Sequence, residues 1–302
     1  MPEDKFLKEQ SVIEKELKRQ ERLAVLRAYE GDDRVVLAEE AKALYAQVGG
    51  FSVKTGIPML DEVTEGFREG ELVVVSGPTK NGKTEFCKTL SVTFGKTVPC
   101  VWFPFEGGYR AFFAKYPGNL DFYIPQKPKD HSVRWVEDRI IESKLKFGTK
   151  VVFIDNLDFL YDDEATKAAG VRDSNFATYV GGIVKKLKEI AMEQEMIVFL
   201  MVHLGKAKWS KLYPPESSDI RDSSRIPQLS DFVLMITRAK NEDGTYIAKN
   251  AMLRVAENRY NGNTKIIGLN LEDDGLFYEA VDWMEEFDEK YKSQDKNKWE
   301  RK

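Results

Sequence analysis

From residue 51 onward, short apolar runs alternate with longer stretches in which apolar residues recur every three or four positions. Short β-branched runs bounded by turn residues are typical of buried strands, and the longer spacing is typical of helices. Strands are therefore expected at residues 71–76, 98–105, 150–156, 196–202 and 232–237. Helices are expected between them at about 84–94, 131–147 and 176–194. This order predicts parallel βαβ units in a doubly wound α/β fold with a mostly parallel central sheet.

The segments after residue 250 follow a different pattern. The runs AMLRVAENR, TKIIGLNLE and GLFYEA are strand-like, and Asn261-Gly262 and Asp274-Gly275 lie between them. Asn-Gly and Asp-Gly pairs favour tight turns between antiparallel strands. We therefore expect C-terminal antiparallel hairpins added to the parallel sheet.

The two ends of the chain are mostly charged. Residues 1–50 are expected to form a helical arm with a break at 31–33, and its sparse apolar positions form a narrow stripe. Such a helix either packs on its own domain or docks on a neighbouring subunit. Gly49-Gly50 marks a boundary, after which residues 51–282 form the core. The tail, residues 283–302, is expected to be disordered, with binding of a partner as the alternative.

Composition narrows the class of protein. The chain has 302 residues, 42% of them hydrophobic, which is enough for a sizeable core. No apolar run approaches the ~20 residues needed to cross a bilayer, and the N-terminus lacks a signal region, so we expect a cytoplasmic protein without membrane contact. Cys87 and Cys100 fall in segments expected to be buried, which indicates reduced thiols. The net charge of −4 gives no global nucleic-acid signature, so any such contact must be local.

A phosphate-binding loop follows the first strand of the core. Gly77, Gly82, Lys83 and Thr84 have the spacing of a P-loop, between an expected strand and an expected helix. Glycines let backbone N–H groups turn toward phosphate oxygens, and the helix N-terminus adds partial positive charge. Lys83 would reach the β- and γ-phosphates of ATP or another nucleoside triphosphate, and Thr84 would offer its hydroxyl to Mg²⁺. The nucleotide-binding residues are expected to be Gly77, Pro78, Thr79, Lys80, Asn81, Gly82, Lys83, Thr84 and Glu85.

Three further expected strands end in polar side chains. Asp155 ends a buried run and is a candidate Mg²⁺ residue, with a simple strand-end cap as the alternative. Glu106 is either the carboxylate that polarises the attacking water or an ordinary surface residue before a Gly-Gly turn. His203 is either a contact to the γ-phosphate or a structural histidine.

The loop after His203 is rich in cations. Lys206, Lys208 and Lys211 are spaced along it, with Trp209 and Tyr213 between and after them. Lysines along a loop suit a phosphodiester backbone, and aromatic rings suit stacked bases. The loop is therefore either a single-stranded DNA contact or a solvated surface segment.

Taken together, these segments resemble the replicative ring helicases with a RecA-like core. TGIPMLDEVTEGFREGELVVVSGPTKNGKT is similar to that family's entry into its nucleotide loop, and SSDIRDSSRIPQLSDFVLMITR is the most diagnostic stretch. ENRYNGNT resembles the segment in which the family places its arginine finger. The likeness covers about residues 51–280 and is strongest to the phage primase-helicases and Twinkle, which also have histidine at the position of His203.

The resemblance implies roles for single residues. Glu106 would be the catalytic carboxylate and His203 the γ-phosphate sensor. Arg259 would reach the neighbouring subunit's nucleotide as the arginine finger, and Arg238 would stack on the base. Lys206, Lys208 and Lys211 would grip single-stranded DNA in the channel of a homo-oligomer, a hexamer in the family. A primase, a loader or a polymerase would be further partners.

The sequence departs from the family's pattern at two positions. Glu257 stands where the family has a lysine two residues before the finger, so either Arg254 or Lys265 substitutes or hydrolysis is weaker. Glu272 stands where the phage enzymes have a tyrosine against the base. The N-terminal arm is also expected to be too short for a primase or a helicase collar.

The sequence leaves three functions open, in order of preference. The first is a ring-forming, ATP-driven translocase that separates DNA strands. The second is a RecA-fold recombination-type ATPase that binds single-stranded DNA without unwinding, which the bare core and Glu257 favour. The third is a regulatory ATPase without nucleic acid, against which the lysine loop argues.

Overall fold

The structure divides the chain into two compact units. The computed structural model describes residues 2–48, 50–160, 173–204, 215–220, 225–240 and 246–280. One unit is Met1–Gly50 and the other is Phe51–Lys302. Each unit is described by itself.

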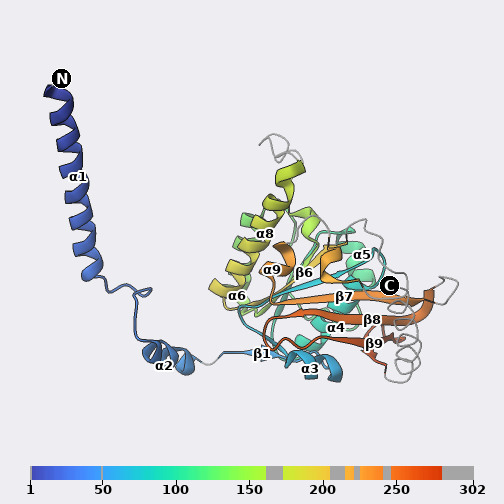
Figure 1. Cartoon of the computed structure of the whole chain (residues 1–302). Coiled ribbons are helices and arrows are strands. Elements are labelled where there is room, and N and C mark those ends of the chain that lie inside the picture. The colour runs from blue at the N-terminus through green and yellow to red at the C-terminus, as the bar shows by residue number, and fades with distance from the viewer. Residues whose placement is uncertain are drawn as a thin grey trace, which may run out of the picture. The chain divides into compact units, whose positions relative to one another are not determined.

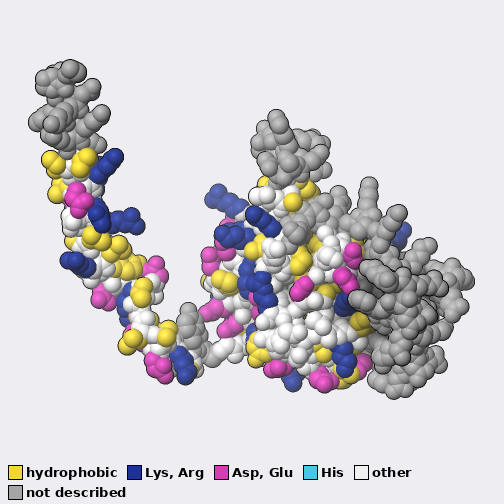
Figure 2. All heavy atoms as spheres, viewed as in Figure 1, with side chains coloured by type: hydrophobic (Ala, Val, Ile, Leu, Met, Phe, Trp, Pro, Cys, Tyr) yellow, Lys and Arg dark blue, Asp and Glu magenta, His cyan; other side chains and the backbone are white. Residues whose placement is uncertain are grey.

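The first unit contains two helices, α1 (Pro2–Arg27) and α2 (Ala38–Val48) (Figure 1). The stretch between them is longer than the expected break at 31–33. Figure 2 shows hydrophobic, basic and acidic side chains interleaved along the described part of α1. Ile13, Leu17 and Leu26 are each more than half exposed, so the described side chains of this unit leave the apolar stripe uncovered.

The second unit is built on one mixed sheet. Its described strands follow the order β10-β9-β8-β7-β3-β6-β5-β4 (Figure 1). The parallel strands are β3 (Leu72–Gly77), β4 (Cys100–Pro104), β5 (Val151–Asp155), β6 (Ile197–His203) and β7 (Phe232–Lys240). The antiparallel strands are β8 (Tyr246–Asn258), β9 (Lys265–Leu271) and β10 (Phe277–Glu279). The predicted parallel sheet with C-terminal hairpins is confirmed.

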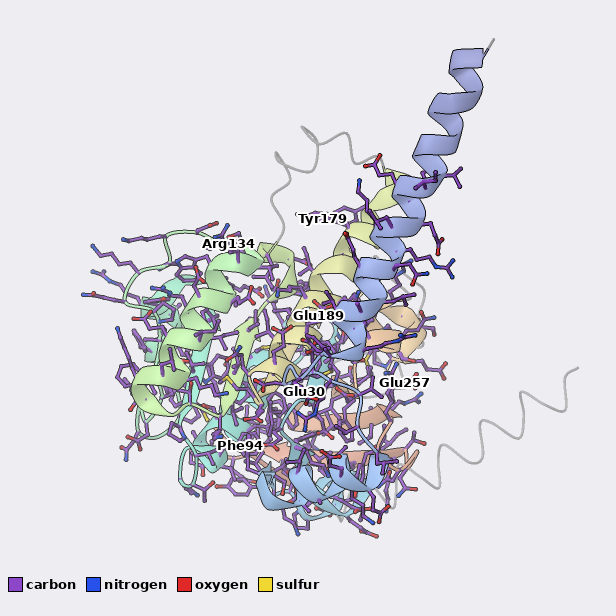
Figure 3. The ribbon with its side chains drawn as sticks, turned by 90° about the vertical axis from the view of Figure 1, so that its left-hand side faces the viewer. Glu30, Phe94, Arg134, Tyr179, Glu189 and Glu257 are labelled. Carbon is purple, nitrogen blue, oxygen red and sulfur yellow. The ribbon has the colours of Figure 1, made fainter. Side chains whose placement is uncertain are left out.

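Helices cover both faces of this sheet. On one face lie α3 (Pro58–Thr64), α4 (Lys83–Phe94) and α5 (Gly108–Ala114). On the other lie α6 (Val133–Phe147), α8 (Asp173–Glu193) and α9 (Arg225–Leu229). Figure 3 looks onto this second layer, with Arg134 at the start of α6 and Tyr179 and Glu189 along α8. Smaller elements are the β1–β2 pair (Ser52–Val53 with Phe67–Arg68) and the 3-10 turns Leu157–Phe159 and Ser217–Asp219.

The alternation of side chains along the strands separates two cores. Val73 and Val75 of β3 face the α4 layer, whereas Leu72 and Val74 face the α8 layer, and all four are fully buried. Successive residues of a strand point to opposite faces, so one continuous apolar run supplies both cores. On the α4 side, the rings of Trp102 and Phe153 stack with centroids 4.5 Å apart.

Two short helices were not expected from the sequence. Gly107 and Gly108 predict a turn, and both have positive φ, but the second glycine already begins α5. The helix α3 precedes β3 within the segment that the resemblance covers.

Cys87 and Cys100 are buried and free, as expected. Among the described helices, none combines the length and the apolar character that crossing a membrane requires.

A partly buried ion pair joins β7 to the helix layer. Asp231 precedes β7, and its Oδ2 accepts hydrogen bonds from the Leu72 backbone N–H and the Lys188 ammonium of α8, both at 2.7 Å. Lys188 also donates to the Gly70 carbonyl at 2.7 Å. One carboxylate thereby fixes the starts of two central strands.

Asp231→Ala is expected to lower the free energy of unfolding by about 2–4 kcal/mol, because it leaves the Lys188 ammonium without its carboxylate and the Leu72 N–H without an acceptor. Denaturant unfolding measures this loss. The exposed Asp138 of α6 supplies the control, since Asp138→Ala is expected to stay within about 0.5 kcal/mol of the parent. Equal effects of the two changes would contradict a structural role for the Asp231 pair.

Candidate functional site

The parallel strands bring the predicted phosphate-binding residues, Glu106, Asp155 and His203 to one edge of the sheet. In the register of β3 with β6, Gly77 lies opposite His203, and in that of β4 with β5, Pro104 lies opposite Asp155. Glu106 follows β4 at the same edge. A cavity of about 610 Å³ opens there. Its lining includes Thr79, Lys80, Gly82, Lys83, Thr84, Glu85, Glu106, Asp155, His203 and Arg238.

The loop after β3 has the backbone geometry that phosphate binding needs. Gly82 has a φ of 99° and is the N-cap residue of α4, and Gly82, Lys83 and Thr84 line the cavity at the N-terminus of that helix. A Cβ atom on Gly77 would lie 2.0 Å from the Ile236 carbonyl oxygen, which leaves room for glycine alone. The Lys83 ammonium donates to the carbonyls of Gly77 at 3.0 Å and Pro78 at 3.2 Å. Burial lowers the pKa of Lys83, and the carboxylate of Asp155 opposes this shift.

The loop is also tied to β7. Asn81 is buried, and its Oδ1 accepts hydrogen bonds from the Arg238 backbone N–H at 2.9 Å and the Thr237 hydroxyl at 3.2 Å. Arg238 itself lines the cavity. The phosphate loop is therefore hydrogen-bonded to the strand that carries the candidate base-stacking arginine.

Thr84 and Asp155 form a hydrogen-bonded pair. The Thr84 hydroxyl donates to Asp155 Oδ2 at 2.8 Å. Asp155 is 2% exposed, and burial raises the pKa of its carboxyl to about 6. Its Oδ1 is buried without a hydrogen-bond partner among the described residues. A hydroxyl and a carboxylate with an unsatisfied oxygen are the ligand types that Mg²⁺ takes beside nucleotide phosphates, so the residues present fit that ion.

Glu106 and His203 are joined through a residue that the sequence did not single out. Asn156 donates from Nδ2 to Glu106 Oε2 at 2.6 Å, and the same nitrogen lies 3.0 Å from His203 Nε2. The direct distance from His203 Nε2 to Glu106 Oε2 is 3.7 Å. An asparagine at the end of a strand is common in turns, which is why the sequence pattern gave no signal for it.

Lys88 is the second residue that the sequence reasoning missed. It is 2% exposed on α4 and lines the same cavity. Its ammonium donates to the Lys115 carbonyl at 3.1 Å, lies 3.6 Å from the Glu85 carboxylate and sits 5.1 Å from the Phe112 ring centroid. Burial lowers the pKa of Lys88. Its position one turn beyond Thr84 could have signalled it.

Arg259 lies at the opposite edge of the sheet from this cavity. It follows Asn258 of β8, which pairs with Phe232 at the start of β7, and Phe232 pairs with Val73 near the start of β3. The phosphate loop follows the other end of β3. Arg259 is exposed, and its guanidinium donates to the Gln228 carbonyl.

The turn that carries Arg259 is held firmly. The Arg259 N–H donates to the Asp231 carbonyl at 2.9 Å. The Asn258 side chain is buried and donates to the Val63 carbonyl at 3.1 Å and to Asn261 Oδ1 at 2.6 Å. The Arg68 guanidinium lies over the Tyr260 ring, 3.3 Å from its centroid. The backbone that carries the exposed Arg259 side chain is thus fixed by several contacts.

Glu257, which stands where the family has a lysine, and Arg254 and Lys265, the two cations that could substitute for that lysine, each contact another residue of the chain. Glu257, labelled in Figure 3, accepts a hydrogen bond from the Ser217 hydroxyl at 2.6 Å. The Arg254 guanidinium lies 3.3 Å from the Glu216 carboxylate, and the Lys265 ammonium lies 2.8 Å from the Met59 sulfur. Leu271, the residue before Glu272, lines the cavity. The predicted DNA contacts Lys206, Lys208 and Lys211 lie outside the described residues.

Comparison with known proteins places the chain in a family. The DnaB-like helicase C terminal domain matches residues 110–279, which is more than half of the chain. The matched range includes Asp155, His203, Arg238 and Arg259 and begins after the phosphate loop. The chain belongs to this family. The resemblance inferred from the sequence is confirmed at this level.

The DnaB-like relatives are longer than this chain. A probable replicative DNA helicase of Trieres chinensis is 24% identical over 239 residues, 68% of this chain and 51% of that protein. The replicative DNA helicase DnaB of Treponema pallidum is 24% identical over 230 residues, 65% of this chain and 50% of that protein. The chain thus spans about half the length of the curated relatives it matches.

Solved structures share the fold of the DnaB-like core. A structure described as an ATPase domain has a TM-score of 0.67 at 18% identity, covering 82% of this chain and 100% of that one. A DnaB-like replicative helicase, solved in a study of its interactions with primase, has a TM-score of 0.61 at 18% identity, covering 89% of this chain and 74% of that one. The predicted RecA-like α/β core is confirmed.

The pKa of Asp155 gives the DnaB-like core a distinctive dependence on pH. The folded value of about 6 exceeds the ordinary 3.8, so the folded state binds more protons between these two pH values. The contribution of Asp155 to the free energy of unfolding therefore falls as pH rises through this window. With Asp155→Asn, the unfolding free energy relative to the parent is expected to rise by roughly 2–3 kcal/mol between about pH 4 and about pH 7.

This prediction is checked by denaturant unfolding at several pH values, with EDTA present and nucleotide absent. A difference between the two proteins that stays constant with pH would mean that the Asp155 carboxyl is charged throughout, against the shift described above.

Proposed function

We propose that this chain is the ATPase core of a ring-forming DNA helicase, which couples the hydrolysis of ATP or another nucleoside triphosphate to movement along single-stranded DNA. The observation that carries the proposal is the placement of two half-sites at opposite edges of one sheet. The cavity around Lys83 supplies groups for phosphates, and Arg259 lies at the far edge on a rigid turn. Membership in the DnaB-like family supports the same assignment.

The cavity supplies the groups that phosphoryl transfer needs. Lys83 would exchange its two carbonyl contacts for the β- and γ-phosphate oxygens, since a charged acceptor is stronger. Thr84 and Asp155 would hold Mg²⁺, which supplies positive charge to the phosphates when bound. Glu106 would orient the attacking water and accept its proton. His203 would contact the γ-phosphate beside it.

Hydrolysis on this scheme requires a second copy of the chain. Arg259 cannot reach its own phosphate loop, because the length of the sheet separates them. In a closed ring each Arg259 would face the cavity of the neighbouring subunit, and an arginine finger contributes roughly 10³–10⁵ in rate. A hexamer is the proposed assembly.

The DNA contact is proposed for the segment after β6. His203 ends that strand at the cavity, and the loop with Lys206, Lys208 and Lys211 comes next in the sequence. His203, which would contact the γ-phosphate, would thereby be separated from the DNA-binding lysines by only a few residues of the chain. A primase, a loader or a polymerase is a proposed partner, and one DnaB-like neighbour was solved in connection with primase. The proposed location is the cytoplasm, that of the host if a phage encodes the chain.

A second candidate is a recombination-type ATPase that binds single-stranded DNA without unwinding. Glu257 favours it, because a carboxylate two residues before Arg259 opposes contact with a neighbour's phosphates. The hydrogen bond from Ser217 keeps this carboxylate engaged within its own subunit, which reduces that objection.

Strand separation on forked DNA with a 5′ single-stranded tail tests the proposal. ATP hydrolysis is followed in the same reaction with ATP and Mg²⁺. Unwinding is expected for the parent protein, and Lys83→Ala is expected to abolish both activities, since it removes the ammonium that holds the phosphates. Glu106→Gln is expected to bind nucleotide and lose turnover.

Three other results would contradict the proposal or one of its parts. DNA-stimulated hydrolysis without unwinding would favour the recombination-type ATPase, and hydrolysis indifferent to DNA would contradict both DNA functions. Turnover that survives Glu106→Gln would show that another group activates the water.

A further inference from the structure

Asn156 lies between Glu106, which is proposed to activate the attacking water, and His203, which is proposed to contact the terminal phosphate. It follows Asp155 at the end of β5 and is 1% exposed. Glu106 comes from the segment after β4, and His203 comes from the end of β6. Because β5 lies between β4 and β6, a side chain at the end of β5 can contact residues from the ends of both neighbouring strands.

The orientation of the Asn156 amide is set by its hydrogen bonds. The backbone N–H of Asp158 donates to Asn156 Oδ1 at 2.9 Å, which caps the 3-10 turn Leu157–Phe159. The amide nitrogen must then face the other way, where it donates to Glu106 Oε2 at 2.6 Å. A carboxylate only accepts hydrogen bonds, so both contacts agree on the same orientation.

The second amide hydrogen determines the state of the histidine. Asn156 Nδ2 lies 3.0 Å from His203 Nε2. Because Nδ2 can only donate, Nε2 must accept, and a neutral ring then carries its hydrogen on Nδ1. Asn156 thus supplies one hydrogen to a carboxylate and one to an imidazole.

We propose that Asn156 is a positioning residue that links the Glu106 carboxylate to the His203 imidazole through its two amide hydrogens, so that the two groups move as a unit. The proposal rests on the function proposed above, in which both groups act at the terminal phosphate. A displacement of His203, which precedes the lysine loop, would pass through Asn156 to Glu106. Turnover would then depend on the position of that loop.

Two substitutions separate this role from the structural one. Asn156→Asp and Asn156→Ser both keep an oxygen that can cap the 3-10 turn, since Asp and Ser are good N-cap residues. Both remove the amide NH2 group with its two hydrogens, and Asn156→Asp also puts a carboxylate against Glu106. Asn119→Asp, at an exposed position of the same core, controls for the change in charge.

The kinetic test is a double-mutant cycle between positions 156 and 203, measured without DNA and with single-stranded DNA. Asn156→Ser is expected to lower kcat about tenfold, the effect of losing a hydrogen bond to a charged group, with KM for ATP nearly unchanged. In a His203→Ala background the same change is expected to lower kcat by clearly less than tenfold, because the link to His203 is already lost and only the hydrogen bond to Glu106 remains. Thermal unfolding confirms that each variant is folded.

Other kinetic results would overturn the link. A parent-like kcat for both variants means that Asn156 acts only as a cap, and a loss of kcat that is the same in both backgrounds means that Asn156 acts independently of His203. If hydrolysis by the parent ignores DNA, the proposed helicase function fails, whereas the cycle measured without DNA still decides the role of Asn156.

A readout independent of turnover is the tautomer of His203. His131 and His203 are the only two histidines of the sequence, so ¹⁵N-histidine spectra of the protein are readily assigned with a His131→Gln variant. At about pH 8.5, where an ordinary histidine is neutral, the parent is expected to show an unprotonated Nε2. Asn156→Asp is expected to move the proton to Nε2, because the new carboxylate accepts. A parent ring protonated on Nε2 would contradict the proposal.

Discussion

The parallel pairing of β3 with β7 is the constraint on which the rest of the site depends. It places the end of β3, with the phosphate loop, at one edge of the sheet and the start of β7 at the other. The antiparallel return of β8 then brings Arg259 back to the edge where β7 begins. A single subunit therefore presents a phosphate site and an arginine about one strand length apart. The two can meet only between copies.

Three charged side chains are buried around the cavity at the ends of the parallel strands. Lys83, Asp155 and Lys88 are nearly fully buried. Burial lowers the pKa of the two lysines and raises the pKa of Asp155, so in each case it favours the neutral form. Each has a specific partner, a backbone carbonyl for the lysines and the Thr84 hydroxyl for Asp155. A site that receives a highly charged ligand can keep such groups because the ligand supplies the missing interactions. On the proposed function, these buried charges would serve nucleotide binding.

The sequence predicted the framework of the site because each part has a strong local signal. The P-loop has fixed glycine spacing, and Asp155, Glu106 and His203 come directly after or at the ends of buried strands, whose parallel order brings them together. The start of α5 was expected to be a turn, since two glycines alone do not indicate a helix after them. Asn156 was missed because its importance comes from contacts with residues about fifty positions away in either direction. The anchoring of Arg259 by Asp231 depends on the same long-range pairing and left no pattern in the sequence.

The central claim, that each active site is completed by a neighbouring subunit, is tested most directly by mixing two inactive variants. Lys83→Ala lacks the phosphate-binding ammonium, and Arg259→Ala lacks the finger, so each alone is expected to be nearly inactive in ATP hydrolysis. In mixed assemblies some interfaces combine an intact Lys83 with an intact Arg259, and the account predicts that hydrolysis returns in part, with a maximum near equal proportions. Activity that stays at the sum of the separate variants at every ratio would contradict it.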